Sequence, residues 1–588
     1  MIPNQMSDFS VPTTESPQTI AYFSMEICLE QGLPTYSGGL GVLAGDTLRA
    51  AADLGVPMVA VTLAHRSGYL VQHLDTDGKQ TETPSVWHPE ELLKPCEPTV
   101  VVEIEGRPVR VRAWRYEVEG HDGHVVPVFL LDTAMTENSP YDATLTDTLY
   151  GGDAHYRLCQ EVVLGMGGAA MLRALGYAQD VCHHINEGHA SLLMLALLER
   201  HLDGRTRWDL QEDDLDAVRR QCVFTTHTPV PAGHDKFPVA LAQTVLGAER
   251  IATLEAAKAI EHDELNMTYV ALRLSRYANA VALRHQSVSQ GMFPGFPITA
   301  VTNGVHAATW TSEPFRALFD HHIPGWRRDN FYLRYASQIA LDDIRDAHAR
   351  AKKTLLDDVQ RRTGIALDLK AFTLGFARRS TPYKRADLIF SDLDRLRQIA
   401  RRTGPLQILY GGKAHPRDEW GKALIGKIVA AAKALDGEVT VIYLENYDMH
   451  LGGLMTSGVD VWLNTPMRPL EASGTSGMKA ALNGVPSFSV LDGWWVEGHM
   501  EGVTGWAIDG DPVLPTDPSD DIHALYLTLE RTILPLYYGL PYAFAEVMRN
   551  AIAINGSFFN TQRMVMQYVR NAYQPNGQRI VQGTAIAG

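Results

Sequence analysis

A lysine stands directly behind a run of small, hydroxylated and glycine residues in the segment Glu471-Ala-Ser-Gly-Thr-Ser-Gly-Met-Lys479. Glycines leave backbone N–H groups open to a phosphate, and the hydroxyls of Thr475 and Ser476 add donors. The residues that follow favour a helix, whose N-terminal end attracts an anion. The pattern predicts a phosphate pocket in which Lys479 either pairs with the phosphate or binds an aldehyde covalently. A solvated lysine on a surface helix is the alternative that these nine residues leave open.

A basic loop is the second place where the sequence indicates chemistry. Ala377-Arg-Arg-Ser-Thr-Pro-Tyr-Lys-Arg385 carries four basic residues and follows a predicted strand at 372–376. The chain as a whole has a formal net charge of −16, so this concentration of cations is unusual in it. Guanidinium and ammonium groups at the end of a parallel strand are typical of an oxyanion site. A solvated basic loop is the alternative.

Two polar clusters follow predicted strands in the first half of the chain. His184-Ile-Asn-Glu-Gly-His189 comes after a strand at 181–185, and Thr226-His-Thr-Pro229 comes after a strand at 222–225. The first cluster lacks the helical histidine spacing of zinc enzymes, so no metal site is predicted. Polar groups at the carboxyl ends of parallel strands more often bind substrate hydroxyls. For His227, a hydrogen-bonded structural histidine is the alternative.

Strands and helices alternate around these candidate residues, which predicts an α/β fold. A strand at 20–25, the glycine turn Ser37-Gly-Gly-Leu-Gly41, a helix at 43–54 and a strand at 56–63 form a βαβ unit. The glycine turn fits close approach of the backbone to an anion, and it fits helix packing equally well. Three strand-like runs predict an antiparallel insertion at about 99–132.

Further alternation is expected in the second half, after a stretch at 310–340 that lacks clear periodicity and is interpreted as a link between domains. A helix at 342–362 and strands at 372–376, 406–409, 439–444 and 459–463 predict a second parallel sheet. An amphipathic helix is expected at 560–573. A length of 588 residues is itself too great for one core and indicates two large domains.

The composition excludes several classes of protein. Hydrophobic content of 45 % and charged content of 20 % are typical of a soluble globular chain. The acidic balance argues against nucleic-acid and anionic-membrane partners, which require a basic face. Five scattered cysteines without a Cys-x-x-Cys pair indicate neither a disulfide framework nor a thiolate metal site. With no secretory signal and no apolar run long enough to span a bilayer, we expect a cytoplasmic enzyme.

The segment from Glu471 to Lys479, continued through Asn483-Gly484 and Leu491-Asp-Gly493, resembles the pyridoxal-phosphate segment of the α-glucan (glycogen, starch and maltodextrin) phosphorylases. The resemblance covers about residues 20 to 573. It implies two Rossmann-like lobes facing across a cleft, the glycosyltransferase B architecture. The expected divisions are 1–305 for the glucan-binding lobe, 306–545 for the cofactor and phosphate lobe, and 546–588 for helices that cross back to the first lobe.

The same resemblance assigns the site residues. It implies that Lys479 holds pyridoxal 5′-phosphate as a Schiff base. It also implies that Thr475, Ser476 and Arg378 contact the cofactor phosphate and that Arg379 and Lys384 contact the substrate phosphate. Gly38 and Gly39 would lie at the glucose and phosphate site. Sugar binding is implied for Asn303, Glu187, His189, Glu471 and the carbonyl of His227. Two residues depart from the long family members: Cys28 replaces an aromatic residue near the cofactor ring, and Thr381 replaces a histidine of the basic loop.

The reaction implied is phosphorolysis of a terminal α-1,4-linked glucose by inorganic phosphate, giving α-glucose 1-phosphate with retention. The cofactor phosphate would act as proton shuttle, since a monoester with a second pKa of about 6 exchanges protons near neutral pH. The expected partners are an α-1,4-glucan and inorganic phosphate, and a homo-oligomer is compatible with the sequence. The alternatives are a glucan synthase that uses a nucleotide sugar, and an inactive glucan-binding relative.

Overall fold

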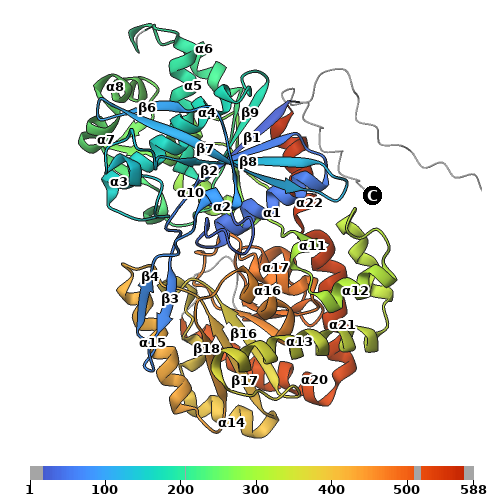
Figure 1. Cartoon of the computed structure of the whole chain (residues 1–588). Coiled ribbons are helices and arrows are strands. Elements are labelled where there is room, and N and C mark those ends of the chain that lie inside the picture. The colour runs from blue at the N-terminus through green and yellow to red at the C-terminus, as the bar shows by residue number, and fades with distance from the viewer. Residues whose placement is uncertain (1–17, 206, 509–517, 575–588) are drawn as a thin grey trace, which may run out of the picture.

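The computed structural model describes residues 18–205, 207–508 and 518–574 (Figure 1). Two β-sheets flanked by helices form its framework, one above the other in the view of Figure 1. We call residues 18–305, which build the first sheet, the N-terminal half, and residues 306–574, which build the second, the C-terminal half. The predicted α/β class is confirmed.

The first sheet runs in the order β15-β14-β10-β9-β1-β2-β8-β7-β5, with β6 paired to β7. Neighbours are parallel from β15 to β8, and β7 is antiparallel to β8. The strands are β1 (Thr19–Ser24), β2 (Met58–Leu63), β5 (Lys94–Pro95), β6 (Val100–Ile104), β7 (Arg107–Glu119), β8 (Val125–Asp132), β9 (Val181–Asn186), β10 (Cys222–Thr225), β14 (Tyr277–Ala280) and β15 (Ile298–Ala300). The sheet of the predicted βαβ unit is therefore present.

Residues 99–132 contain the three predicted strands in antiparallel order, but the last of them is also part of the parallel sheet. Strands β6 and β7 pair antiparallel, but β8 lies parallel to β2 and belongs to the main sheet. Every residue of β8 after Val125 is buried, and strands buried on both faces are typical of parallel sheets. The run of residues 125–132 is thus a core strand at the junction between the parallel and antiparallel parts.

Helices cover the first sheet on both faces (Figure 1). Residues 154–174 form one helical stretch, in which a π-helical turn at Val163–Gly167 joins α3 to α4. The helices of this half are α1 (Gly39–Asp53), α2 (Pro89–Leu92), α3 (Ala154–Val162), α4 (Gly168–Ala174), α5 (Leu192–Leu202), α6 (Glu212–Arg219), α7 (Val239–Leu246), α8 (Ala248–Ala256), α9 (Met267–Arg273) and α10 (Leu283–Met292). A small antiparallel sheet of β11 (Lys236–Pro238), β13 (Glu264–Asn266) and β12 (Ile260–Glu261) lies beside them.

The second sheet has the order β18-β17-β16-β19-β20-β21, and all its neighbours are parallel. Its strands are β16 (Phe372–Ala377), β17 (Leu406–Gly411), β18 (Thr440–Leu444), β19 (Val461–Asn464), β20 (Ser487–Val490) and β21 (Gly505–Ile508). The helices of this half are α11 (Ala307–Trp310), α12 (Glu313–His322), α13 (Leu341–Thr363), α14 (Leu393–Thr403), α15 (Glu419–Ala434), α16 (Met449–Gly458), α17 (Ser476–Leu482), α18 (Trp495–Gly498), α19 (Pro518–Thr528), α20 (Leu534–Gly539), α21 (Pro541–Asn550) and α22 (Thr561–Tyr568).

The stretch at 310–340 is more than a link. It contains α12 and a 3₁₀ helix at Asn330–Gln338, and its aromatic residues Phe315, Phe319 and Trp326 are buried in the core of the C-terminal half. Phe315 and Phe319 are four residues apart and therefore share one face of α12. Proline, charge and aromatic residues obscured this periodicity in the sequence.

A hairpin of the N-terminal half reaches the C-terminal half. Strands β3 (Val71–Leu74) and β4 (Gln80–Thr83) extend beside α15 in Figure 1. Gln72 Nε2 donates to the carbonyl of Gly412 at 2.9 Å, and Gln80 Nε2 donates to the carbonyl of Ala414 at 2.9 Å. Both amides are buried, so these hydrogen bonds join the two halves away from solvent.

The helix α22 and the π-helical turn Val569–Tyr573 return to the N-terminal half. Met564, Val565 and Tyr568 are buried against a core that includes Ile20 and Tyr22. No helix among the described residues is both long and apolar enough to cross a membrane.

Candidate active site

Lys479 lies on the short helix α17, and its side chain is buried. Its Nζ stands 3.5 Å from the centroid of the Trp310 ring. Burial lowers the pKa of Lys479 to about 8, and the nearby charge of Asp46 acts in the opposite direction. With a pKa of about 8, roughly a tenth of the amine is unprotonated at pH 7, and this is the form that attacks an aldehyde. Because its side chain is buried, Lys479 is not a solvated lysine on a surface helix.

Trp310 is fixed from the N-terminal half. Its Nε1 donates to Asp46 Oδ2 at 2.7 Å, and Asp46 lies on α1. The indole is buried, so it forms a rigid apolar wall beside the amine. The sequence analysis did not select Trp310, because nothing local connects residue 310 with 479.

The run of small, hydroxylated and glycine residues before Lys479, which we call the cradle, has structural as well as candidate binding roles. Gly474 has a φ of +84°, which favours glycine and makes the turn into α17. A Cβ on Gly477 would stand 2.8 Å from both Ser487 Oγ and Trp494 Cζ2, so this glycine lets α17 pack closely. Ser476 Oγ accepts a hydrogen bond from Trp462 Nε1 at 3.0 Å. Gly477 is thus explained by packing, without any phosphate.

The basic loop meets the same cradle. Glu471 Oε2 lies 2.6 Å from Lys384 Nζ and 2.7 Å from Arg378 NH2, and all three side chains are buried. Burial would raise the pKa of Glu471, but the two cations hold it below its usual range. Arg378 NH1 is also buried and has no hydrogen-bond partner among the described residues. The cluster carries one surplus positive charge and an unused donor, which suits an anion.

Arg379 and the glycine turn come together from the two halves. A Cβ on Gly38 would stand 3.2 Å from Arg379 NH2, whereas one on Gly39 would meet nothing within 4 Å. Arg379 is accessible to solvent and so remains available to a ligand. The four basic residues of the loop are therefore not a uniform solvated surface.

The N–H of Gly38 is already paired, which differs from the expected phosphate contact. It donates to Glu26 Oε2 at 3.1 Å, and the N–H of Ser37 donates to the same oxygen. Tyr150 Oη donates to Glu26 Oε1 at 2.9 Å. Glu26 therefore fixes the conformation of the glycine turn, and Arg379 lies against Gly38 from the other half.

Glu187, in the first polar cluster at 184–189, makes its hydrogen bonds within the protein. Glu187 Oε2 accepts from the N–H of His227 at 2.8 Å and from Thr228 Oγ1 at 2.9 Å, and Oε1 accepts from the N–H of Gly188. Burial opposes ionisation of Glu187, but His234, His227 and His189 together lower its pKa. Glu187 therefore holds the two strand-end loops together.

His227 has a bonded ring, as the structural alternative supposed. Its Nε2 lies 2.6 Å from Asn186 Oδ1, and burial lowers its pKa to about 4. The ring is neutral at physiological pH. The backbone carbonyl of His227 is therefore the group of this residue that suits a partial positive charge on a bound sugar. His189 belongs to a separate buried cluster, with Nε2 3.5 Å from Asp235 Oδ2.

Asn303 differs from these residues because its side chain has a free acceptor. Its backbone carbonyl accepts from Arg563 NH2 at 2.9 Å, but Oδ1 is buried and has no partner among the described residues. An unpaired buried amide oxygen is costly unless a ligand donates to it. Within the described residues, no group of three or more His, Cys, Asp or Glu side chains is suited to a metal ion.

Comparison with known proteins identifies the family. The model of the carbohydrate phosphorylases matches residues 171–503. The maltodextrin phosphorylase of Thermococcus litoralis is 39 % identical over 96 % of this chain and 71 % of its own length. The glycogen phosphorylase of Mycobacterium tuberculosis is 38 % identical over 98 % and 73 %, and that of Aquifex aeolicus is 34 % identical over 94 % and 86 %. The chain belongs to the carbohydrate phosphorylase family.

Cys28 and Thr381 have different local surroundings in the structure. Cys28 is buried, and its Sγ donates to Met449 Sδ at 3.5 Å. Burial raises the pKa of the Cys28 thiol to about 12, so it remains an uncharged apolar group. Thr381 precedes the 3₁₀ turn at Pro382–Lys384, and its buried Oγ1 has no partner in the described part of the chain.

Besides Trp310, two further residues of this phosphorylase were missed by sequence reasoning. Glu26 shapes the glycine turn, and its only signal was an acidic residue directly after a buried strand. Asp492 accepts the N–H groups of Glu471 and Gly493, each at 2.9 Å, and so fixes the loop that carries Glu471. In the sequence, only the glycine that follows Asp492 could have drawn attention to it, and nothing connected it with residue 471.

Proposed function

We propose that this phosphorylase transfers the terminal α-1,4-linked glucose of a glucan to inorganic phosphate, releasing α-glucose 1-phosphate with retention of configuration. Family membership and the relatives named maltodextrin and glycogen phosphorylase support this activity. The observation that carries the proposal is the buried amine of Lys479 over Trp310, together with a buried cluster of two cations and the carboxylate of Glu471, which lies eight residues before that lysine.

The two sheets correspond in this proposal to the lobes of a glycosyltransferase B fold, with the active site between them. The divisions at 1–305, 306–545 and 546–588 are part of the same proposal. The convergence of Gly38 and Arg379 from different halves supports it, because ligands of parallel α/β sheets bind at the carboxyl ends of the strands. Both residues follow such strand ends, β1 and β16.

Pyridoxal 5′-phosphate fits the residues present around Lys479. The amine is buried, partly unprotonated and walled by an aromatic ring, and Arg378 NH1 is an unpaired donor in the ion cluster that Arg378 forms with Glu471. We infer that Lys479 holds the cofactor covalently, with Thr475, Ser476 and Arg378 at its phosphate. When bound, the cofactor supplies a phosphate monoester able to exchange a proton near neutral pH.

The residues of the chain would act by binding and electrostatics. Arg379 and Lys384 would hold the inorganic phosphate, and a cationic setting keeps it as an anion next to the reacting carbon. The bond-breaking transition state is oxocarbenium-like, so the phosphate charge and the carbonyl of His227 would stabilise it. Asn303 and Glu471 would orient the sugar hydroxyls, Asn303 through its free Oδ1.

An assay of the purified protein with maltoheptaose and phosphate tests this function. We expect production of glucose 1-phosphate, with the α-anomer visible by proton NMR before any equilibration. Glucan binding without phosphate consumption would instead support the inactive relative. Glucan synthesis that requires a nucleotide sugar would support the synthase.

A further inference from the structure

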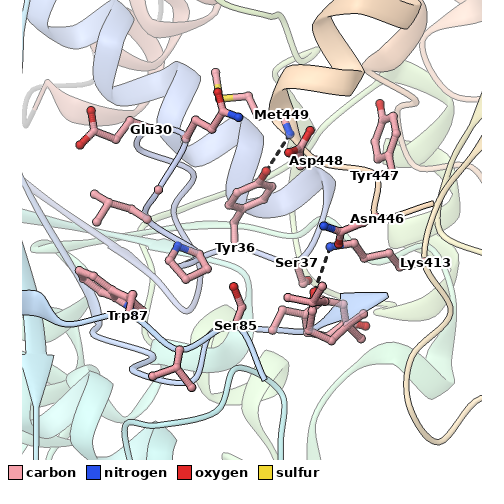
Figure 2. A pocket seen from close by; sticks show the side chains of 18 residues that line it. Glu30, Tyr36, Ser37, Ser85, Trp87, Lys413, Asn446, Tyr447, Asp448 and Met449 are labelled. Carbon is pink, nitrogen blue, oxygen red and sulfur yellow. Dashed lines mark hydrogen bonds between the residues drawn. The ribbon is translucent and has the colours of Figure 1, made fainter. Parts of the chain in front are cut away.

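A cavity of about 210 Å³ lies between the two halves of the chain (Figure 2). The N-terminal half contributes residues 30–34, 36–37, 69–71 and 85–87, and the C-terminal half contributes Lys413 and residues 446–449. None of the residues assigned above to glucose, phosphate or cofactor lines it. The cavity is therefore distinct from the candidate active site.

The lining combines aromatic and polar side chains. In Figure 2, Trp87 stands on one side, Lys413 and Asn446 stand on the other, and Tyr36 and Ser85 lie between them. Asp448 adds a carboxylate near Met449. Aromatic faces together with convergent hydrogen-bonding groups are typical of small-molecule sites.

These side chains are held in place before any ligand arrives. Trp87 Nε1 donates to the carbonyl of His65 at 2.8 Å, and Tyr36 Oη accepts from the N–H of Met449 at 2.8 Å. Lys413 Nζ donates to the carbonyl of Leu70 at 3.0 Å, which leaves two of its three N–H bonds for other acceptors. A ligand would thus meet a largely preformed site, with little ordering cost.

Charge and size narrow the ligand class. The charged lining residues are Lys413, Glu30 and Asp448, so the cavity has a net negative charge and disfavours phosphates and nucleotides. Its volume is below the range of about 300–1,000 Å³ typical of drug-sized ligands, which leaves room for one ring. A pyranose has apolar C–H faces for an aromatic ring and hydroxyls for ammonium, amide and carboxylate groups.

We propose that this cavity is a second, non-catalytic binding site for a neutral hexopyranose such as glucose. Because both halves line the site, a sugar bound there favours the arrangement of the halves seen in the structure. Ser37 lines the cavity, and the next residue, Gly38, lies against Arg379. The sugar therefore stabilises the contact between Gly38 and Arg379, which forms the proposed phosphate site. This coupling rests on the proposed function, whereas the binding of the sugar does not.

Fluorine NMR of the full chain labelled with 5-fluorotryptophan tests the binding. The chain has ten tryptophans, and the variants Trp87→Phe and Trp310→Phe identify the two resonances needed. Trp87 reports on the cavity, and Trp310 reports on the candidate active site. With D-glucose as the probe, the Trp87 resonance should shift saturably, with a Kd on the order of 1–10 mM, the weak range expected for one sugar ring.

A pair of lysine variants provides the control. Lys413→Met keeps the length of the side chain but removes the ammonium, and it should weaken the Trp87 response at least fivefold, about 1 kcal/mol. Lys433→Met removes another lysine that joins the halves, through Asp77 at 2.6 Å, but lies outside the cavity. This variant should leave the Trp87 response unchanged.

Three outcomes would overturn the proposal. They are a Trp87 resonance that does not respond to glucose, a response equally strong in Lys413→Met, and a response to adenosine in place of glucose. The measurement requires no turnover, so absence of phosphorolysis would count against the proposed function and leave this result intact.

Discussion

Arg379 and Gly38 are in contact although they belong to different halves of the chain: a Cβ added to the glycine would stand 3.2 Å from the NH2 of the arginine. Such a distance is tight, so even one methyl group requires the guanidinium to move by a few tenths of an ångström. The glycine turn therefore limits where Arg379 can point.

Gly38→Ala should consequently raise the KM for phosphate by roughly threefold to tenfold, because small displacements of a binding group are costly in a closed site. The fold should tolerate the change, since the φ of Gly38 is −164°, an extended value open to any residue. Gly39→Ala is the matched control, because its Cβ meets nothing within 4 Å. Initial rates at varied phosphate measure both. Equal KM values in the two variants would show that the contact has no role in phosphate use.

Removing the guanidinium altogether should have a larger effect. We expect Arg379→Ala to reduce kcat/KM for phosphate by an amount equivalent to ~2–4 kcal/mol, the scale of losing a charge-assisted donor in a site of this kind. Cofactor content should stay near that of the unmodified protein, because Arg379 is assigned to the substrate and not to the cofactor. Unchanged phosphate kinetics would show that Arg379 is a solvated residue without a role in phosphate binding.

Lys479 should carry about one pyridoxal phosphate per chain. We expect absorbance above the protein band, and borohydride should fix the cofactor to the peptide containing Lys479. Phosphorolysis should survive this reduction to a substantial degree, because the proposed proton exchange uses the phosphate and not the carbonyl carbon. Lys479→Ala should lose both absorbance and activity.

Lys413 is the control for this assignment. Burial lowers the pKa of Lys413 to about 8, as it does for Lys479, so an unprotonated amine alone does not distinguish them. Lys413→Met should keep the absorbance. Borohydride labelling of a peptide other than that of Lys479 would refute the assignment, and complete inactivation by borohydride would indicate chemistry at the carbonyl carbon.

Asp492 should make stability depend on pH. Burial, and then the charge of Glu471, raise the pKa of Asp492 to about 7 from its ordinary 3.8, against the opposing N–H groups of Glu471 and Gly493. A carboxyl group with a raised folded-state pKa contributes stability below its unfolded pKa, and this contribution is lost as pH rises through the folded value. The free energy of unfolding should therefore fall between about pH 4 and 7, by at most about 1.4 kcal/mol per pH unit from this group.

Asp492→Asn should remove that slope, since an amide does not titrate. Denaturant unfolding at pH 5 and pH 7.5 measures it, and the difference between the two proteins isolates Asp492 from the other titrating groups. A difference that stays constant across this range would show that Asp492 is ionised throughout.

The sequence was informative where function depends on neighbours in the chain. The helix behind the cradle, the strand before the basic loop and the parallel strands at 181–185 and 222–225 all follow from local patterns, and the structure contains them. The family resemblance was likewise carried by short contiguous motifs, and the family is confirmed. Lys479 could be selected because its cradle is contiguous.

Pairings between distant residues could not be predicted in the same way. Glu26 pairs with the turn at 37–38, Gln72 pairs with Gly412, and Trp310 lies beside Lys479 only because the fold brings them together. The hydrogen bond of Gly38 is another example, because the composition of the turn gave no sign that the carboxylate of Glu26, just after β1, accepts its N–H. The stretch at 310–340 was misjudged because its aromatic spacing is interrupted by prolines and charges.

The return of α22 to the first sheet also constrains the order of folding during synthesis. Tyr573 Oη lies 2.7 Å from His184 Nδ1, and Met564, Val565 and Tyr568 complete the core around Ile20 and Tyr22. Helix α1 covers part of this face of β1 early, but the face is completed only when residues near 573 have emerged. A nascent chain of this protein leaves the rest of that face uncovered while its C-terminal half is translated, which favours binding of a chaperone at the ribosome exit.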